Sequence, residues 1–319
     1  MRVAFFGTPE FAVPSLRALV GEGFDVVAVV TQPDAPQGRS RSTLIPPPVK
    51  VAAESEELTI FQPEKPTDGA FVLRLRDLRP DIGVVVAYGH ILKPELLELP
   101  SRGMVNVHPS LLPGLRGAAP VEWAIIRGHE TTGVTIMQLD AGMDSGPILH
   151  QIPHRIGADV TGGELSAHLA EMGAQALIET LAMLEQSDPP PQPVPQNEDR
   201  ATFAPKLTRE IARIDWTKDA RAIGCLLRGL DPRPGAWTEL NGVELKLFNP
   251  KVNPPPFPGT GAPGEVLAAD GSLVIATGPF KDTAGGTVEI FEVQPAGKAR
   301  MTTDDWLRGA RLKAGTRLT

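Results

Sequence analysis

Two polar side chains, Asn106 and His108, close a short apolar run in the sequence MVNVHPSLLPG (104–114), and Pro109 follows them at once. In a strand, side chains two residues apart point to the same side of the sheet. We therefore expect Asn106 and His108 to project together from the end of a strand. Asp144 lies in the glycine-flanked sequence GMDSG (142–146), a loop that can bring an acid back over that strand end.

An amide, an imidazole and a carboxylate together favour one type of reaction. The amide can donate a hydrogen bond to a developing oxyanion, the imidazole can move a proton, and the carboxylate can stabilise the imidazolium. These groups suit direct acyl-type transfer through a tetrahedral intermediate, without a metal ion or a covalent enzyme intermediate. From the spacing alone, a purely structural role for His108 stays open as an equal alternative.

Several cofactor motifs are missing from the sequence. It has no G-x-x-x-x-G-K-[ST] phosphate loop and no H-E-x-x-H, and the turn FFGTPEFA (5–12) has one glycine where a dinucleotide fingerprint needs three. Cys225 is the single cysteine, which excludes an intrachain disulfide and a cysteine-cluster zinc site. Nucleotide and metal cofactors are therefore not expected.

The elements that must position the three residues follow from the hydrophobic pattern. Continuous apolar runs predict buried strands, and the segments between them predict helices, which favours an α/β fold with a mostly parallel sheet that carries ligands at the carboxyl ends of its strands. The link 140–146 between the last two predicted strands is too short for a parallel crossover, so these strands are predicted to form an antiparallel hairpin. A long helix is predicted after them. The predicted strands are 3–6, 26–31, 82–86, 104–108, 133–139 and 148–156, and the predicted helices are 10–20, 49–56, 69–79, 93–98 and 162–186.

The second half of the chain has a different pattern. Five prolines in the fourteen residues 187–200 predict an extended linker. Beyond the linker, short β-like runs between Gly, Pro and Asn predict a small β-barrel that follows a helical entry. The predicted helical segments are 209–216 and 219–231, and the predicted strands are 236–240, 243–248, 264–269, 272–277 and 287–294.

Composition and charge bound the function. The 319 residues are 41% hydrophobic and 22% charged, enough for two globular domains. No apolar run is long enough to cross a bilayer and no signal-peptide pattern is present, so we expect a cytoplasmic protein outside the membrane.

The net charge of −7 is unevenly distributed: residues 1–202 carry 15 Lys and Arg against 25 Asp and Glu, and residues 203–319 carry 16 against 13. A mildly basic second half could contact phosphates, with an ordinary solvated surface as the equal alternative.

The sequence also resembles the methionyl-tRNA formyltransferase family almost from end to end. The motifs that carry the resemblance are FFGTPEFA, TQPDAPQGRS, PPPVKVAA, VVVAYGHIL, NVHPSLLPGLRGAAP, GVTIMQLDAGMDSG, APKL with ARIDW, and QPAGK, in this order. The resemblance implies transfer of the formyl group of 10-formyltetrahydrofolate to the amino group of methionyl initiator tRNA. It also implies a Rossmann-like formyltransferase domain (1–187), a proline-rich linker (188–205) and a C-terminal OB-like tRNA-binding domain (206–319).

The resemblance assigns roles to individual residues. Asn106, His108 and Asp144 match the catalytic positions, and the resemblance implies no metal and a monomer. The folate is expected to contact two segments and the loop after them, at Val86, Tyr88, Gly89, His90, Ile91, Leu92, Ser110, Leu111, Leu112, Pro113 and Asp140. The tRNA is expected at Arg39, Arg41, Arg116 and Lys206.

The chain departs from the family pattern at two places. Gly114 and Leu115 stand where many members have a basic and an aromatic residue, and GRSRST (38–43) replaces a segment that usually reads Gly-Arg-Gly-Lys. Related catalytic domains occur in glycinamide ribonucleotide formyltransferase, in amino-sugar formyltransferases and in the hydrolase part of formyltetrahydrofolate dehydrogenase. An RNA-binding module without catalysis is the alternative from another class, and the intact Asn106, His108 and Asp144 argue against it.

Overall fold

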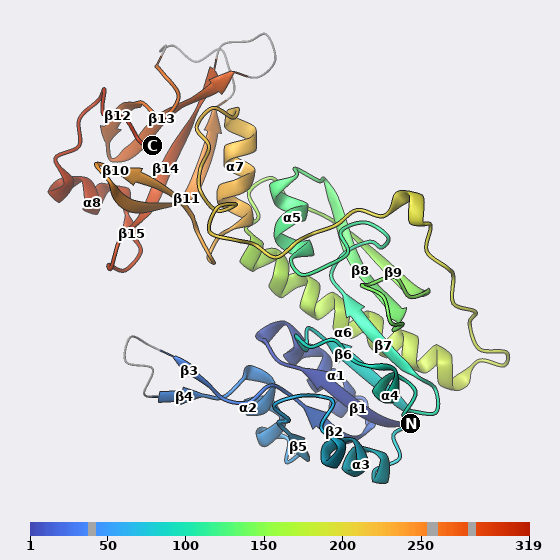
Figure 1. The fold of residues 1–319 in the computed structure, drawn as a ribbon. Helices are drawn as coiled ribbons and strands as arrows, with labels where there is room; N and C mark the ends of the chain where they lie inside the picture. The colour runs from blue at the N-terminus through green and yellow to red at the C-terminus, as the bar shows by residue number, and fades with distance from the viewer. Residues whose placement is uncertain (38–42, 254–260, 280–284) are drawn as a thin grey trace. The chain divides into compact units, whose positions relative to one another are not determined.

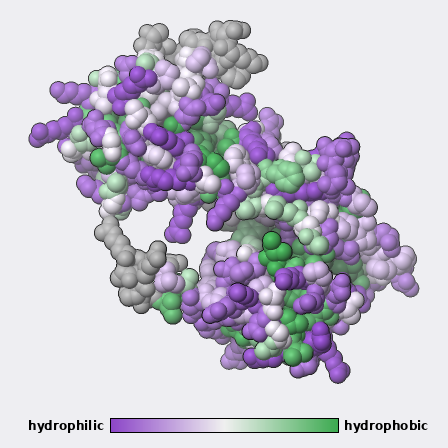
Figure 2. Space-filling model, in the orientation of Figure 1, coloured by the Kyte–Doolittle hydropathy of each residue, from purple (hydrophilic) through white to green (hydrophobic). Residues whose placement is uncertain are grey.

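The computed structural model describes residues 1–37, 43–253, 261–279 and 285–319, and they form two compact units (Figure 1). The first unit contains Met1–Pro120, Thr132–Arg155 and Ser166–Ala204, and the second contains Val121–Thr131, Ile156–Leu165 and Pro205–Thr319. Polar residues cover most of the surface visible in Figure 2, with scattered apolar patches between them. Across those four ranges, no helix combines the length and apolar character that crossing a bilayer requires.

A seven-stranded sheet forms the centre of the first unit. Its strand order is β5-β2-β1-β6-β7-β8-β9, in which β5, β2, β1, β6 and β7 run parallel and β8 runs antiparallel to β7. The carboxyl ends of β1, β6 and β7 therefore share one edge. The strands are β1 (Arg2–Gly7), β2 (Asp25–Val30), β5 (Ile60–Phe61), β6 (Ile82–Val86), β7 (Met104–His108), β8 (Thr131–Gln138) and β9 (Ile148–Arg155).

Helices cover both faces of this sheet. Ala4 and Phe6 of β1 pack in one buried cluster with Leu75 of α3 and Leu96 of α4. On β7, Val107 points to the opposite side, where a Cβ on Gly173 of α6 would lie 2.8 Å from its Cγ1. The α/β fold with a mostly parallel sheet is thus confirmed. The helices up to Gln186 are α1 (Val13–Gly21), α2 (Pro48–Ser55), α3 (Gly69–Asp77), α4 (Pro94–Leu97), α5 (Pro120–Ile126) and α6 (Gly162–Gln186), and short 3-10 turns lie at Glu10–Ala12 and Glu198–Arg200.

Some short elements carried no usable signal in the sequence. The antiparallel pair β3 (Ala35–Gln37) and β4 (Thr43–Ile45), the two-residue β5 and the helix α5 were not predicted. Strands of two or three residues are too short to show an alternation of apolar and polar side chains, which is the signal on which strand prediction depends.

The second unit is built on an antiparallel sheet of order β10-β11-β14-β13-β12, with β15 paired to β14. The C-terminal segment bonds to both edges of this sheet, because Thr319 exchanges backbone hydrogen bonds with Glu239 and Leu318 donates to Gly264. It thereby closes the small barrel. The elements are α7 (Ala220–Gly229), β10 (Ala236–Leu240), β11 (Val243–Asn253), β12 (Val266–Asp270), β13 (Ser272–Pro279), β14 (Gly285–Pro295), β15 (Met301–Thr302) and α8 (Thr303–Ala310).

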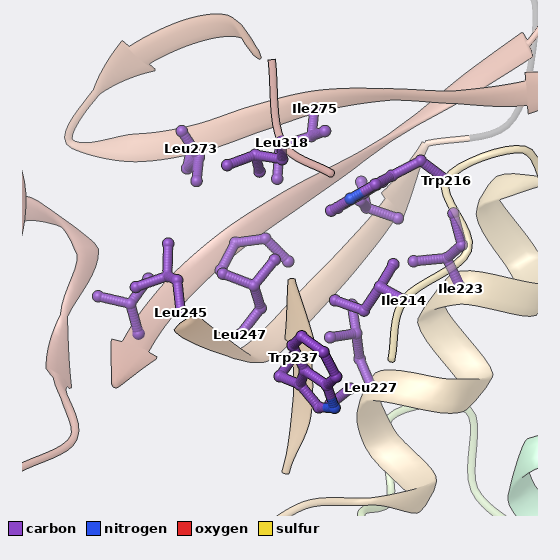
Figure 3. Close-up of a cluster of buried hydrophobic side chains, with 14 of the residues drawn as sticks. Ile214, Trp216, Ile223, Leu227, Trp237, Leu245, Leu247, Leu273, Ile275 and Leu318 are labelled. Atoms are coloured by element: carbon purple, nitrogen blue, oxygen red, sulfur yellow. The ribbon is translucent and has the colours of Figure 1, made fainter. Parts of the chain in front are cut away.

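The core of the second unit lies between α7 and the sheet (Figure 3). Ile223 and Leu227 of α7 meet Trp216, Trp237 and the inward residues of the strands there. Both indole N–H groups are satisfied: Trp216 donates to Thr238 Oγ1 at 3.0 Å and Trp237 donates to the Arg209 carbonyl at 2.9 Å. Buried tryptophans with bonded N–H groups give this small core a large apolar area without an unpaired donor.

The predicted helix at 209–216 is wrong. These residues form turns and a short extended stretch, in which Ile214 donates to the Trp237 carbonyl and Trp237 donates to the Ala212 carbonyl. Pairing with the edge of β10 satisfies this backbone and overrides the helix-like composition of REIARIDW. The helix predicted at 219–231 is confirmed as α7, which begins after Asp219, whose side chain accepts from the Ala222 N–H.

Candidate active site

His108 and Asp144 meet at the carboxyl end of β7. His108 Nδ1 lies 3.7 Å from Asp144 Oδ2, and both side chains are largely buried, with 5% and 19% of their surface exposed. The other ring nitrogen, Nε2, is 3.0 Å from the backbone carbonyl of Leu115. A carbonyl only accepts, so this contact assigns the proton to Nε2 and leaves Nδ1 facing the carboxylate.

Two opposing influences act on the imidazole. Burial lowers the pKa of His108 below 6.5, and the Asp144 charge together with the Leu115 carbonyl raises it. Burial is the larger influence, so the resting histidine is neutral near pH 7. A neutral imidazole beside a carboxylate can accept a proton and is stabilised as soon as it does.

Asp144 is held in place by its backbone and its carboxylate. Its φ of 50° puts it in the left-handed region, which is uncommon for a residue with a side chain. Oδ2 accepts the Gly117 N–H at 2.8 Å, and the Asp144 carbonyl accepts from Gln196 Nε2 at 2.8 Å. The loop 140–146 thus returns over β7, as the sequence predicted.

Asn106 projects from the same side of β7 as His108, two residues earlier. It pairs in register with Val85 on β6 and with Met137 on β8, and its side chain is half-buried. Within the described residues, no hydrogen bond engages its amide. An amide without a protein partner beside the histidine is available to an incoming oxygen.

The segment Ser110–Pro113, predicted to bind folate, is fixed by hydrogen bonds rather than by packing alone. The Thr135 hydroxyl donates to the Ser110 carbonyl at 2.6 Å and accepts the Leu112 N–H at 3.1 Å. Gln151 Nε2 donates to the Leu112 carbonyl at 3.0 Å. Ser110 and Leu112 are buried, and Leu111 and Pro113 are half-buried, so the half-buried pair is the part open to a ligand.

The second predicted folate segment, Val86–Leu92, follows β6. The Tyr88 carbonyl accepts from Thr8 Oγ1 at 2.9 Å and from Gln32 Nε2 at 3.0 Å, which ties this segment to the ends of β1 and β2. Burial raises the pKa of the Tyr88 phenol to about 12, so it does not exchange protons near pH 7. The side chains of this segment that face solvent are those of Ala87, His90 and Ile91.

Asp140 begins the loop that ends at Asp144. Its carboxylate accepts from the Gly142 N–H at 2.9 Å and from the Ser145 hydroxyl at 3.1 Å, so its predicted contact with folate would share those oxygens. No group of three or more His, Cys, Asp or Glu side chains that could hold a metal ion occurs in the described part of the chain.

The residues predicted to bind tRNA fall into three situations. Arg39 and Arg41 lie outside the described residues. Lys206 is exposed in the second unit. Arg116 is only 3% exposed, and its guanidinium bonds to Gln196 and Glu198. A buried guanidinium whose donors are used inside the protein is not placed to contact phosphates, so we reassign Arg116 to a role within the site.

The end of the predicted linker contributes to the site, which sequence reasoning missed. Residues 196–204 belong to the first unit and run beside the loop that follows β7. Arg116 and Ala118 donate to the carbonyls of Thr202 and Ala204, and Ala204 donates to the Arg116 carbonyl. Apart from the polar run QNEDR at its end, a proline-rich segment gives no periodic pattern from which such docking could be predicted.

Comparison with known proteins agrees with this geometry. Residues 1–181 match the formyl transferase family model, and residues 206–311 match the model of the formyl transferase C-terminal domain. Methionyl-tRNA formyltransferase from Jannaschia sp. (strain CCS1) is 44% identical over 316 residues, which cover 99% of this chain and 99% of that protein. Methionyl-tRNA formyltransferase from Halalkalibacterium halodurans is 45% identical over 312 residues, which cover 97% and 95%.

A solved structure supports the fold. The N-formyltransferase from Helicobacter canadensis in complex with folinic acid and dTDP-3-aminofucose superposes with a TM-score of 0.67 over 92% of this chain and 98% of that chain, at 18% identity. The full-length identity to the two curated relatives, both domain models and the arrangement at the end of β7 lead to one conclusion. The chain belongs to the methionyl-tRNA formyltransferase family.

Proposed function

We propose that this enzyme transfers the formyl group of 10-formyltetrahydrofolate to the free amino group of methionyl initiator tRNA, by direct transfer at the end of β7. The observation that carries the proposal is the arrangement there: His108 Nδ1 faces Asp144 at 3.7 Å, and the Asn106 amide is without a partner among the described residues. The product is N-formylmethionyl-tRNA, the form used to initiate translation.

The reaction can be written with the residues in place. The methionyl nitrogen attacks the formyl carbon, a new C–N bond forms, and the carbonyl electrons move to the oxygen, where the Asn106 amide donates a hydrogen bond. His108 accepts the proton that the amine loses, and Asp144 stabilises the imidazolium. As the bond from the formyl carbon to N10 breaks, N10 takes up a proton, so tetrahydrofolate leaves and neutral His108 is regenerated.

The folate donor is proposed to lie across the two anchored segments described above. Because Tyr88, Ser110 and Leu112 are buried, these segments offer a ligand mainly backbone groups and the side chains of their exposed neighbours. Backbone groups fixed by Thr135, Thr8 and Gln32 are preorganised for a flat heterocycle with several donors and acceptors.

The tRNA acceptor is proposed to engage Lys206 and the segment that contains Arg39 and Arg41. We also propose the division into a catalytic domain (1–187), a linker (188–205) and a tRNA-binding domain (206–319). A cytoplasmic location and a monomeric state are the sequence-based expectations that go with this function.

The test is a direct incubation with three amine acceptors. The purified protein is mixed with 10-formyltetrahydrofolate and methionyl initiator tRNA, glycinamide ribonucleotide or an amino-sugar nucleotide, and formylated product is measured. Of the three acceptors, we expect only methionyl initiator tRNA to be formylated. Formylation of either small acceptor at a comparable rate would contradict the proposal, and so would the absence of formyl-methionine.

A further inference from the structure

We propose that Gln196, at the end of the predicted linker, is a positioning residue that fixes Asp144 beside His108, with Arg116 and Glu198 holding its amide in the required orientation. The inference rests on the proposed function, because it gives Asp144 its role. It goes further by assigning part of the active-site geometry to a segment that the sequence marks only as a connection.

Gln196 bonds to the Asp144 loop at two points. Its Nε2 donates to the Asp144 carbonyl at 2.8 Å and to the Gly146 carbonyl at 2.7 Å. Both carbonyls follow the loop tip at Met143, which is 65% exposed: one belongs to Asp144 itself and the other lies two residues later. One amide group therefore holds the returning side of the loop, where the carboxylate is attached.

Arg116 determines which way this amide points. Arg116 Nε and Nη2 lie 3.1 Å and 2.7 Å from Gln196 Oε1. A guanidinium offers donors alone, so the amide oxygen has to face Arg116 and the NH2 group has to face the two carbonyls. In the opposite orientation the amide NH2 would face the two Arg116 donors, and the amide oxygen would face the two carbonyl oxygens.

Glu198 fixes Arg116 in turn. Its two carboxylate oxygens accept from Arg116 Nη1 and Nη2, each at 2.8 Å, in the two-point geometry that gives such pairs their directional specificity. The hydrogen bond to Glu198 raises the pKa of Arg116, so its charge is permanent. The network thus runs from an exposed glutamate through a buried guanidinium to the catalytic loop.

Asp144 needs such support because its conformation is not one that the chain prefers. It has a positive φ of 50°, a backbone conformation that is strained for a non-glycine residue and persists only where the surrounding structure imposes it. Its carboxylate accepts the Gly117 N–H, and among the described residues Gln196 is the side chain that hydrogen-bonds to its backbone. Without Gln196, we expect the loop to move and the 3.7 Å separation of Asp144 from His108 to lengthen.

Gln196 can be changed without detaching the segment, because the chain beside it is held by its backbone. Thr202 and Ala204 exchange main-chain hydrogen bonds with the loop 113–118, and Val194 exchanges two with Ile148. Gln196→Met keeps the length of the side chain and removes its donor and its acceptor. We therefore expect a folded protein with a displaced Asp144.

The matched control is Gln192→Met, the same chemical change four residues earlier on an exposed side chain. For Gln196→Met, we expect kcat to fall by roughly 10- to 100-fold, the cost of a misplacement of about 1 Å, while KM for the folate changes far less. Gln192→Met keeps the parental kcat. Equal kcat values for the two variants, with both folded by thermal unfolding, would overturn the proposal.

A double-variant cycle separates positioning from a general effect on the fold. If Gln196 acts through the Asp144 carboxylate, then adding Gln196→Met to Asp144→Asn costs much less than it costs alone. Independent, multiplying losses would show that Gln196 acts elsewhere. An unaffected Asp144→Asn single variant would refute the catalytic role of Asp144, whereas a parent protein that does not formylate methionyl-tRNA would refute the proposed function, so these failures are distinguishable.

Gln196→Glu is the second test, in case the methionine variant unfolds. A carboxylate keeps both bonds from Arg116 and replaces the donor to Asp144 and Gly146 by an acceptor that repels their carbonyls. We expect a stable protein with a loss of kcat at least as large as that of Gln196→Met. A folded Gln196→Glu variant with the parental kcat would overturn the proposal.

Discussion

Asp144 acts on His108 by charge across 3.7 Å, a distance too long for a hydrogen bond. The carboxylate therefore stabilises the imidazolium without having to accept its proton. Asp144→Asn keeps the shape and removes the charge. We expect kcat to fall at least about 100-fold, within the 10²–10⁴ range for proton-transfer roles, with a much smaller change in the folate Kd. Steady-state kinetics and folate titration measure both, and near-parental turnover would refute the role.

Asn106 is expected to act in the transition state alone, since its amide has no partner among the described residues. Asn106→Ala removes a donor aimed at charge that develops during the reaction. We expect a loss of about 3 kcal/mol in transition-state stabilisation that appears in kcat. Steady-state kinetics with 10-formyltetrahydrofolate as the varied substrate measures kcat and KM separately. A change confined to KM would make Asn106 a ground-state ligand instead.

The buried imidazole also predicts how stability depends on pH. The folded pKa of His108 lies below 6.5 because burial dominates. Between the folded value and 6.5 the unfolded chain binds a proton that the folded chain does not, so the free energy of unfolding falls as the pH is lowered through this window. When the pH is lowered from about 7.5 to about 5.5, we expect the Tm of the His108→Gln variant to decrease less than the Tm of the parent. Equal losses would contradict this expectation.

At the scale of elements, the sequence predicted the strand that carries the site and missed the segment that supports it. β7 is buried on both faces, so a continuous apolar run and a spacing of two indicated where Asn106 and His108 point. The 3.7 Å contact of His108 with Asp144 could not be predicted, because it depends on loop conformations set by Gly117 and Gln196. These contacts are made by side chains and backbone far apart in sequence, without any periodic pattern.

Gly117 tests how tightly the loop after β7 and the end of the linker fit together. Its φ is 115°, and an added Cβ would lie 2.9 Å from the Ala204 carbonyl oxygen. For Gly117→Ala we expect the free energy of unfolding to fall by about 1–3 kcal/mol, together with a fall in kcat because the Gly117 N–H holds Asp144.

Gly103→Ala is the control for backbone strain alone. Gly103 has a φ of 70° and no atom within 4 Å of the added Cβ. For Gly103→Ala we expect the free energy of unfolding to fall by about 1–2 kcal/mol and kcat to stay unchanged. A Gly117→Ala variant whose kcat matched that of Gly103→Ala would show that the fit at Ala204 does not position Asp144.

At the scale of the whole molecule, the charge is divided as the proposed division of labour requires. The first 202 residues carry the acidic excess and the remaining residues a small basic one. An acidic catalytic part does not attract a polyanion by its average charge, so capture of tRNA has to depend on local basic groups. Arg39 and Arg41, in a segment otherwise poor in charge, are the candidates within the first half of the chain.

Replacing both arginines tests whether this segment supplies charge alone or also selects the tRNA. For Arg39→Ala/Arg41→Ala we expect a higher KM for methionyl-tRNA and a smaller salt dependence, because each lost phosphate contact lowers the log–log slope by about 0.9 on duplex-like nucleic acid. We also expect weaker discrimination between initiator and elongator tRNA, because arginines that contact base edges select the tRNA in addition to supplying charge.

The matched control is Arg17→Ala/Arg76→Ala, which removes the same charge from exposed positions on α1 and α3. The measured quantity is the ratio of kcat/KM for the two tRNAs at fixed salt, in each double variant and in the parent. If the ratio is unchanged while both values fall, the segment acts through charge alone, because a non-selective contact weakens both tRNAs equally. If neither value changes relative to the control, Arg39 and Arg41 do not contact the tRNA, and the capture of the acceptor has to be assigned to the second unit around Lys206.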